Sequence, residues 1–178
     1  MLISKLLKAI WLVGFSSLPL LLHAATVYET QADFLGRAFS GSPPEPGVIW
    51  LSGEKKSTVH DLLGHDYPAL RLRYWCQTPR SAWVLEELGK EQPITVGIIV
   101  ENSYIKNLKV LTYRENRGGE VANAAFTDQF TRVSLDADTR LDTKIDGISG
   151  ATLSVRALTR LANLALYLHG ESGCNNGT

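Results

Sequence analysis

The stretch Asp146-Gly147-Ile148-Ser149-Gly150-Ala151-Thr152 organises the chain, because a long helical pattern begins where this stretch ends. Apolar side chains beyond it recur at helical spacing and form one stripe. The stripe consists of Ala157, Leu158, Leu161, Leu164, Ala165 and Leu168. We therefore predict a helix that begins near Thr152, runs to about Leu168 and has Gly170 as its C-cap.

The start of this helix is suited to holding an anion. The N–H groups of a first helical turn have no partners within the helix. A phosphate on the Thr152 hydroxyl would be stabilised by these groups and by the helix dipole, by about 0.3 to 1 kcal/mol at an exposed site. Gly147 and Gly150 leave room for a bulky group beside the backbone. The alternative is an ordinary helix start, in which Ser149 accepts a backbone hydrogen bond as the cap.

A hairpin is predicted upstream of the motif. Ile94–Val100 is apolar on both faces, whereas Tyr104–Tyr113 alternates more regularly. We expect the first strand near the centre of an antiparallel sheet and the second nearer an edge. Asn102 favours the tight turn between them, because asparagine tolerates positive φ. The loop 115–119 follows, and its glycines allow a bulky group to approach the backbone.

The motif resembles the flavinylation sequence D-x-x-S/T-G-A-T/S of the FMN-binding domain family, which it matches at every defining position. This family includes peripheral subunits of sodium-pumping quinone reductases and of Rnf-type electron-transport complexes. The resemblance implies that FMN is joined through its phosphate to Thr152. It also implies that an FAD:protein FMN transferase forms this bond outside the cytoplasmic membrane, with FAD as the donor and a divalent metal such as Mg²⁺. In that reaction Thr152 is the attacking hydroxyl, Asp146 helps the transferase to recognise it, and Ser149, Gly150 and Ala151 set the turn.

The resemblance extends over about residues 94–168 and includes the loop after the hairpin. Family members often have E-T-P-G-x-G in this place, packed near the flavin. Glu115, Gly118 and Gly119 stand at the corresponding positions and are therefore expected near the flavin, although the loop lacks the proline. Arg117, in the same loop, could neutralise a flavin anion or mark a partner surface, but it is interpreted as a solvated side chain.

The rest of the pattern predicts an α+β fold, in which an antiparallel sheet packs with helices and the C-terminal helix follows the flavin-attachment motif. Helices are expected just after Thr30, from a Ser57 cap to Leu63 with Gly64 closing it, and over 120–130. Strands are expected at 48–51 and 70–76, and a surface connection at 132–144. The pattern of 82–88 is compatible with a helix or a strand, and a strand is preferred.

Three aromatic side chains could in principle stack on a flavin. They are Trp75, Trp83 and Tyr113. Aromatic residues in strands usually belong to the core or pair with a neighbouring strand, so we interpret all three in that way.

The first residues are typical of a targeting segment. Two lysines precede an apolar run over 9–22, which is short for a membrane span of about 20 residues. Residues 1–25 are therefore predicted to be a signal peptide, with an uncleaved N-terminal anchor as the alternative. Residues 26–93 are an N-terminal part of the domain without an assigned role, 94–170 the FMN-binding core, and 171–178 a disordered tail.

Composition excludes several functions. With 18 basic and 18 acidic side chains the net charge is +0, which disfavours a nucleic-acid partner. The sequence also lacks a recognisable metal site. No Cys/His cluster has zinc spacing, and the acidic run 136–142 lacks the glycine and the terminal glutamate of a calcium loop. The His and Asp residues at 60–66 are interpreted as solvated. Cys76 and Cys174 either pair in an oxidising compartment or remain a buried thiol and a tail residue.

Export and the motif together predict a periplasmic or extracytoplasmic electron-transfer flavoprotein. It would relay electrons between a membrane or periplasmic donor and an acceptor, as a carrier rather than as a self-sufficient enzyme, because the sequence shows no identifiable substrate pocket. Two alternatives remain open. One is the flavin subunit of an extracytoplasmic reductase, which requires a substrate site beside the flavin, and the other is a flavin-free binding or assembly module.

Overall fold

The computed structural model of the chain describes residues 25–175. The predicted signal peptide lies outside the described residues, apart from Ala25. The elements are, in chain order, β1 (Thr26–Val27), α1 (Gln31–Ala38), β2 (Gly47–Trp50), α2 (Gly53–Leu63), β3 (Arg71–Gln77), β4 (Arg80–Leu88), β5 (Pro93–Glu101), β6 (Tyr104–Tyr113), η1 (Gly119–Ala122), α3 (Ala124–Thr127), η2 (Asp128–Phe130) and α4 (Thr152–Glu171).

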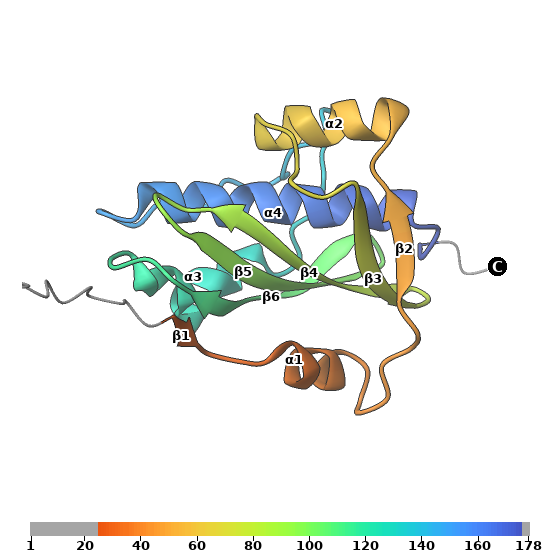
Figure 1. Cartoon of the computed structure of the whole chain (residues 1–178), viewed down its shortest axis with the longest axis horizontal. Helices are drawn as coiled ribbons and strands as arrows, with labels where there is room; N and C mark the ends of the chain where they lie inside the picture. Colours follow the sequence, from red (N-terminus) through yellow and green to blue (C-terminus); the bar gives the residue numbers. More distant parts are fainter. Residues whose placement is uncertain (1–24, 176–178) are drawn as a thin grey trace, which may run out of the picture.

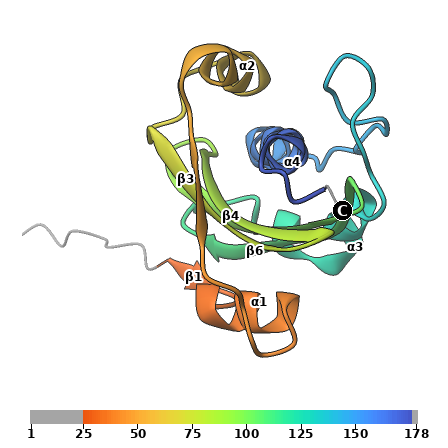
Figure 2. The same cartoon turned by 90° about the vertical axis from the view of Figure 1, so that its right-hand side faces the viewer.

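The strands form one six-stranded antiparallel sheet in the order β1-β6-β5-β4-β3-β2. Helix α4 lies across one face of the sheet with α2 outside it, and α1 lies on the opposite face (Figures 1 and 2). This arrangement confirms the predicted α+β fold. β5 is central in the sheet and buried along most of its length. On the outer side of β6 the sheet contains only the two-residue β1, so β6 lies near an edge, as the patterns predicted.

Two local features explain the tight β5–β6 turn and the close packing of α1 on the sheet. Asn102 has a φ of 53° in the β5–β6 turn, as predicted from its tolerance of positive φ. On the α1 face, a Cβ on Gly97 would lie 2.6 Å from the Phe34 ring. Gly97 therefore lets α1 pack directly on the central strand, and the Thr30 hydroxyl caps that helix by accepting the Asp33 N–H.

Two apolar cores flank the sheet. The larger contains α2, α4 and the inward side of the strands, and the smaller lies under α1. Trp83 is fully buried in the larger core and stacks on Tyr74 with ring centroids 5.1 Å apart. Trp75 belongs to the smaller core, and Tyr113 is 4% exposed. The structure therefore confirms that these aromatics are packing residues.

Two predicted helices have different bounds from those expected. α2 begins at Gly53 with Ser52 in the cap position, so Ser57 is not a cap; its hydroxyl donates to the Glu54 carbonyl inside the helix. Gly64 ends this helix in the left-handed conformation, as predicted. The single helix expected over 120–130 is wrong: Asn123 is extended (φ −70°, ψ 141°) and divides the segment into η1, α3 and η2.

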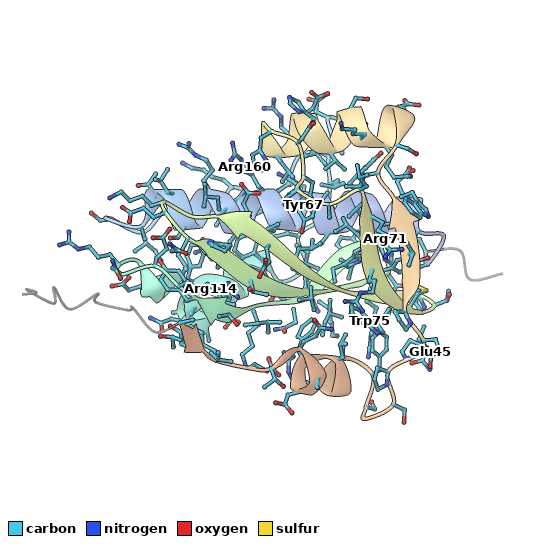
Figure 3. All side chains as sticks on the ribbon, in the orientation of Figure 1. Glu45, Tyr67, Arg71, Trp75, Arg114 and Arg160 are labelled. Carbon is cyan, nitrogen blue, oxygen red and sulfur yellow. A yellow bond between two sulfur atoms is a disulfide. The ribbon has the colours of Figure 1, made fainter. Side chains whose placement is uncertain are left out.

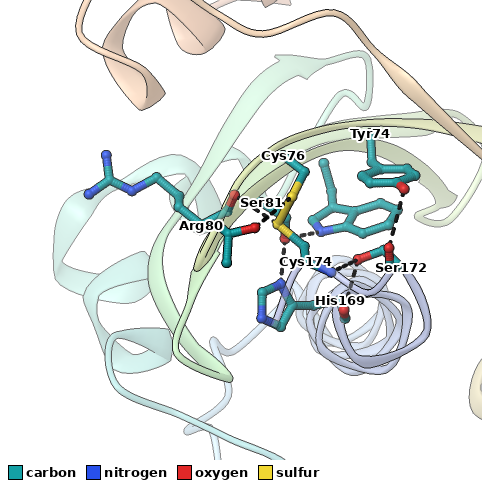
Figure 4. The surroundings of a disulfide bond; sticks show 9 residues. Tyr74, Cys76, Arg80, Ser81, His169, Ser172 and Cys174 are labelled. Atoms are coloured by element: carbon teal, nitrogen blue, oxygen red, sulfur yellow. Dashed lines mark hydrogen bonds between the residues drawn. A yellow bond between two sulfur atoms is a disulfide. The ribbon is translucent and has the colours of Figure 1, made fainter. Parts of the chain in front are cut away.

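α4 is longer than its apolar stripe predicted. It continues through Gly170 to Glu171, so Gly170 is not the C-cap, and the left-handed glycine is instead Gly173 (φ 71°). A disulfide between Cys76 and Cys174 fixes the following residues against β3 (Figure 4). The tail expected from residue 171 is therefore ordered as far as 175, while 176–178 lie outside the described residues.

A buried polar cluster lies beside the disulfide. The Ser81 hydroxyl accepts the Trp83 indole N–H at 2.8 Å and lies 2.7 Å from His169 Nδ1 (Figure 4). Burial lowers the pKa of His169 below its ordinary value, against a smaller opposing effect of Asn175. His169 is therefore expected to be neutral in the folded protein at neutral pH.

Two general properties of residues 25–175 complete the fold. None of the helices in this range combines the length and the apolarity needed to cross a bilayer. Across the same residues, no three His, Cys, Asp or Glu side chains converge in a way that could hold a metal ion. The acidic run instead caps its own loop, since Asp136 accepts the N–H groups of Asp138 and Arg140.

Candidate functional site

The motif 146–152 forms a turn that leads directly into α4. The Ala151 N–H donates to the Ile148 carbonyl at 3.0 Å, and Gly150 has a φ of 83°, a conformation that favours glycine. A Cβ on Gly150 would meet nothing within 4 Å. Gly150 is therefore required by the backbone conformation of the turn, and the space beside it is open.

Thr152 is the first residue of α4, and its side chain is exposed. The preceding Ala151 occupies the N-cap position, and no side chain of the described residues caps this end. Ala151 adopts φ −120° and ψ 21°, which is not the extended conformation of most capping residues. The N–H groups of the first turn thus remain available, and the alternative of a Ser149-capped helix start is not what the structure shows.

The loop 115–119 packs against this helix start. The Tyr113 hydroxyl donates to the Arg117 carbonyl and lies 3.0 Å from the Ser154 hydroxyl, which links the loop to the first turn of α4. Burial raises the pKa of Tyr113. Gly118 has a φ of 83°, and a Cβ there would lie 2.9 Å from the Tyr113 oxygen and 3.1 Å from the Ala151 Cβ. The glycine at 118 is therefore needed for close packing of loop and helix.

Glu115 holds the turn between β4 and β5 in place. Its Oε1 accepts the backbone N–H groups of Lys90, Glu91 and Gln92, the last two at 2.6 and 3.0 Å, which form the turn between β4 and β5. Burial raises the pKa of this carboxyl group, but the three N–H groups and the Lys90 charge outweigh that effect, so its pKa is below the ordinary value. The charged carboxylate therefore holds the turn 89–92 beside the loop.

These segments enclose a cleft of about 380 Å³ at the N-terminal end of α4. Its wall is made by the turn after β4, the loop after β6 and the first turn of the helix. The lining residues are Lys90, Glu91, Glu115, Asn116, Arg117, Gly150, Ala151, Thr152, Leu153 and Ser154. The cleft thus contains two cationic side chains beside the exposed threonine.

The structure brings together some of the predicted site residues and separates others. Thr152, Gly150, Ala151 and Glu115 line the same cleft. Gly118 and Gly119 lie behind it, against Tyr113, whose ring is 3.8 Å from a Cβ built on Gly119. Ser149 and Asp146 are exposed outside the cleft. The Asp146 N–H donates to Gln129 Oε1 at 2.8 Å, which fixes the start of the motif against η2.

Sequence reasoning missed most of the opposite wall. Lys90 and Glu91 lie in a turn bounded by Gly89 and Pro93. The Glu115 carboxylate binds the backbone of this turn and so connects it to the loop 115–119. Arg117 was interpreted as solvated; it is exposed, yet it lines the cleft, and among residues 25–175 no carboxylate pairs with it. For Lys90, Glu91 and Arg117, the one indication in the sequence is the pair of glycines in the loop 115–119, which predicts a close approach to the backbone there.

Comparison with known proteins now adds to this geometry. Residues 89–167 match the model of the FMN-binding domain family. The match begins at the turn 89–92 and ends within α4, so it contains every segment that lines the cleft. This match confirms the resemblance to the FMN-binding domain family that the motif indicated. It also supports FMN as the cofactor of a flavoprotein. A search of curated proteins finds no match.

The residues present fit this cofactor. A phosphate requires hydrogen-bond donors and neutralising charge. The uncapped helix start offers the donors, and Arg117 offers the charge, since Lys90 is paired with Glu91. A ring system requires open space beside the backbone, which Gly150 and the cleft provide. The exposed hydroxyl of Thr152 lies where these two requirements meet.

Proposed function

We propose that this protein is an exported electron carrier in which FMN is joined to Thr152 by a phosphoester bond. The observation that carries the proposal is the exposed hydroxyl of Thr152 at an uncapped helix start, beside a cleft within the segment that matches the FMN-binding domain. A bound flavin supplies one- and two-electron chemistry, whereas the protein supplies attachment, position and charge.

The attachment reaction balances with FAD as the donor. The Thr152 oxygen attacks the phosphorus of the FMN half of FAD, a new O–P bond forms, and the bond between the two phosphorus groups breaks. AMP leaves, and the hydroxyl proton passes to a base supplied by the modifying enzyme. The proposed partner is an FAD:protein FMN transferase with Mg²⁺, which needs access to the acceptor; Thr152 and the exposed residues Asp146, Ser149 and Gly150 offer that access.

After attachment, the chain's own residues would hold the cofactor in the cleft. The first-turn N–H groups of α4 would donate to the phosphate, and Arg117 would offset its negative charge. The Glu115 carboxylate would keep the Lys90 turn in place through the backbone. Leu153, at 39% exposure, would offer apolar surface at the rim.

Export and redox partners belong to the same proposal. The N-terminal sequence pattern supports delivery outside the cytoplasm, as a periplasmic protein or one held by an uncleaved anchor. The disulfide between Cys76 and Cys174 agrees with an oxidising compartment. The electron donor and acceptor would be membrane or periplasmic redox proteins.

The test is co-expression of the full chain with an FAD:protein FMN transferase in an exporting host. Intact mass should increase by FMN less one water, and the denatured band should fluoresce in a gel under ultraviolet light. Thr152→Ala should abolish both signals. The matched control Thr131→Ala, which alters another exposed threonine, should retain them. An unmodified wild-type chain, or an adduct that survives in Thr152→Ala, would refute covalent attachment at this residue.

A further inference from the structure

The face of the sheet that carries α1 is only partly covered. α1 packs on β4 and β5, and its core includes Trp75 of β3, so β2 and the part of β3 that contains Arg71 and Arg73 are left open on that side (Figures 1 and 2). A groove of about 630 Å³ lies there, lined among others by Val48, Arg71, Arg73, Trp75 and Val84. Arg71 and Trp75 extend from β3 on the side of β2 and α1 (Figure 3).

The side chains of this groove and of Trp50, which neighbours it on β2, are typical of a protein-binding surface. Val48 and Trp50 are 46% and 58% exposed, although both belong to a strand. The Arg71 guanidinium lies 5.8 Å from the centroid of the Trp50 ring, where it forms a cation–π contact. Exposed tryptophan and arginine are the residues most enriched among the energetic centres of protein interfaces. The exposed apolar pair Val48 and Trp50, beside arginines on an open sheet surface, therefore indicates a binding site for a partner protein.

The charge of the groove selects the chemistry of that partner. Arg71 and Arg73 are exposed, and among residues 25–175 neither forms an ion pair. The two acids of the adjacent strand β4 have partners of their own: Glu86 is bound by Thr95 and Arg114, and Glu87 by His65 and Arg160. The two cations are thus left to attract carboxylates from outside.

The backbone adds a second requirement. β2 is the last strand in the order of the sheet and pairs only with β3 among the described strands. In an antiparallel strand alternate N–H and C=O groups face away from the neighbour, so the outer edge of β2 offers unpaired donors and acceptors. Such an edge binds an extended segment by main-chain hydrogen bonds.

We propose that β2 and the groove beside it bind an extended acidic segment of a partner protein, which adds to the sheet as a further strand. Carboxylates on its groove-facing side meet Arg71 and Arg73, and the methylene groups of the same side chains cover Val48 and Trp50, because all four residues lie on one face of the sheet. A bilayer surface fits less well, because lipid cannot supply the directional hydrogen bonds of a sheet edge. A second copy paired through β2 would add a strand without any acidic side chain, because β2 consists of Gly47–Trp50, and it would leave Arg71 and Arg73 without carboxylates.

The position of this surface gives it a role separate from the flavin. Thr152 lies at one end of α4, and the disulfide at the other end fastens the chain to β3, which contributes to the groove. A helix of 20 residues is about 30 Å long. A partner bound at β2 therefore leaves the flavin end free for electron exchange, so the segment acts as a tether rather than as a redox contact.

The test uses the full-length exported protein and fluorescein-labelled octapeptides in which Glu alternates with Val, with a Lys-for-Glu set as the charge-reversed control. The acidic peptides should bind, and affinity should fall as salt increases. Arg71→Gln/Arg73→Gln and Trp50→Ala should each weaken binding about tenfold or more. Arg140→Gln, which removes another exposed unpaired arginine, and the charge-conserving Arg71→Lys/Arg73→Lys should bind within about threefold of the wild type.

Hydrogen exchange locates the contact, and circular dichroism confirms that each variant is folded. The acidic peptide should slow exchange at the β2 amides, and the same should hold for protein that carries no flavin, so the result is independent of the proposed function. Equal binding of acidic and basic peptides, protection elsewhere, or no binding would overturn the proposal. Binding only to vesicles that contain anionic phospholipid would also overturn it, as would a β2-dependent dimer in sedimentation.

Discussion

Replacement of Glu115 tests whether the loop after β6 organises the site or contacts the flavin directly. The carboxylate accepts three backbone N–H groups from the turn 89–92, so Glu115→Ala leaves all three without their acceptor. Water can reach this half-buried turn, and each lost bond then costs about 0.5 to 1 kcal/mol rather than the full value for a charged buried pair. We expect the free energy of unfolding to decrease by about 2 kcal/mol.

Two further variants separate charge from geometry. Glu115→Gln keeps an oxygen acceptor but loses the charge, so a decrease of about 1 kcal/mol is expected. Glu91→Ala removes an exposed glutamate from the same turn, whose ion pair with Lys90 is exposed on both sides, and it should change stability by less than about 0.5 kcal/mol. Urea denaturation followed by circular dichroism measures all three, on protein without flavin.

The pH dependence provides an independent check. Because the pKa of Glu115 is lowered in the folded state, its stabilisation is present above the ordinary glutamate pKa and is lost as pH falls through the folded value. Wild type and Glu115→Gln should therefore differ at about pH 7 and converge near about pH 3. If Glu115→Ala unfolds at the wild-type urea concentration while the spectrum of the attached flavin shifts, Glu115 is a cofactor contact and not the support of the turn.

Three other outcomes follow from buried contacts. Tyr113→Phe removes the links to Arg117 and the helix start and should lower the free energy of unfolding by about 1 to 3 kcal/mol in urea. Cys76→Ser/Cys174→Ser opens a loop closed over a separation of 98 residues and should cost about 3 to 5 kcal/mol, which reduction of the wild type should reproduce. The pKa of His169 is lowered, so unfolded chains take up its proton first and wild-type stability should fall from about pH 7 to about pH 5, more steeply than in His169→Gln.

Local patterns in the sequence were enough for elements whose own side chains determine them. The central hairpin and α4 have long apolar patterns, and both lie where these patterns predicted. The bounds of α2 and the break at Asn123 were wrong because short polar segments carry little periodicity and several serines or asparagines can cap. The residues after α4 are fixed by a disulfide to a residue 98 positions away, which no local pattern contains.

The same distinction applies to the site. The turn and the exposed threonine follow from residues adjacent in sequence, and the structure shows Gly150 with positive φ and Thr152 at the helix start, as that reasoning required. The opposite wall depends on contacts across more than twenty residues, such as the bond from Glu91 to Glu115. Such contacts exist only once β4, β5 and β6 are paired, so the sheet topology had to be known first.

The uncapped start of α4 lowers the stability of the helix but suits the proposed phosphate site. An absent N-cap costs a helix about 0.5 to 2 kcal/mol. α4 tolerates this because it is enclosed between the sheet and α2, with Leu158, Leu161 and Leu164 fully buried, and because the disulfide holds its other end. A capping oxygen at residue 151 would use the N–H groups that a phosphate on Thr152 needs. The helix is therefore stabilised along its length but not capped at its first turn, which leaves those donors free for the proposed phosphate.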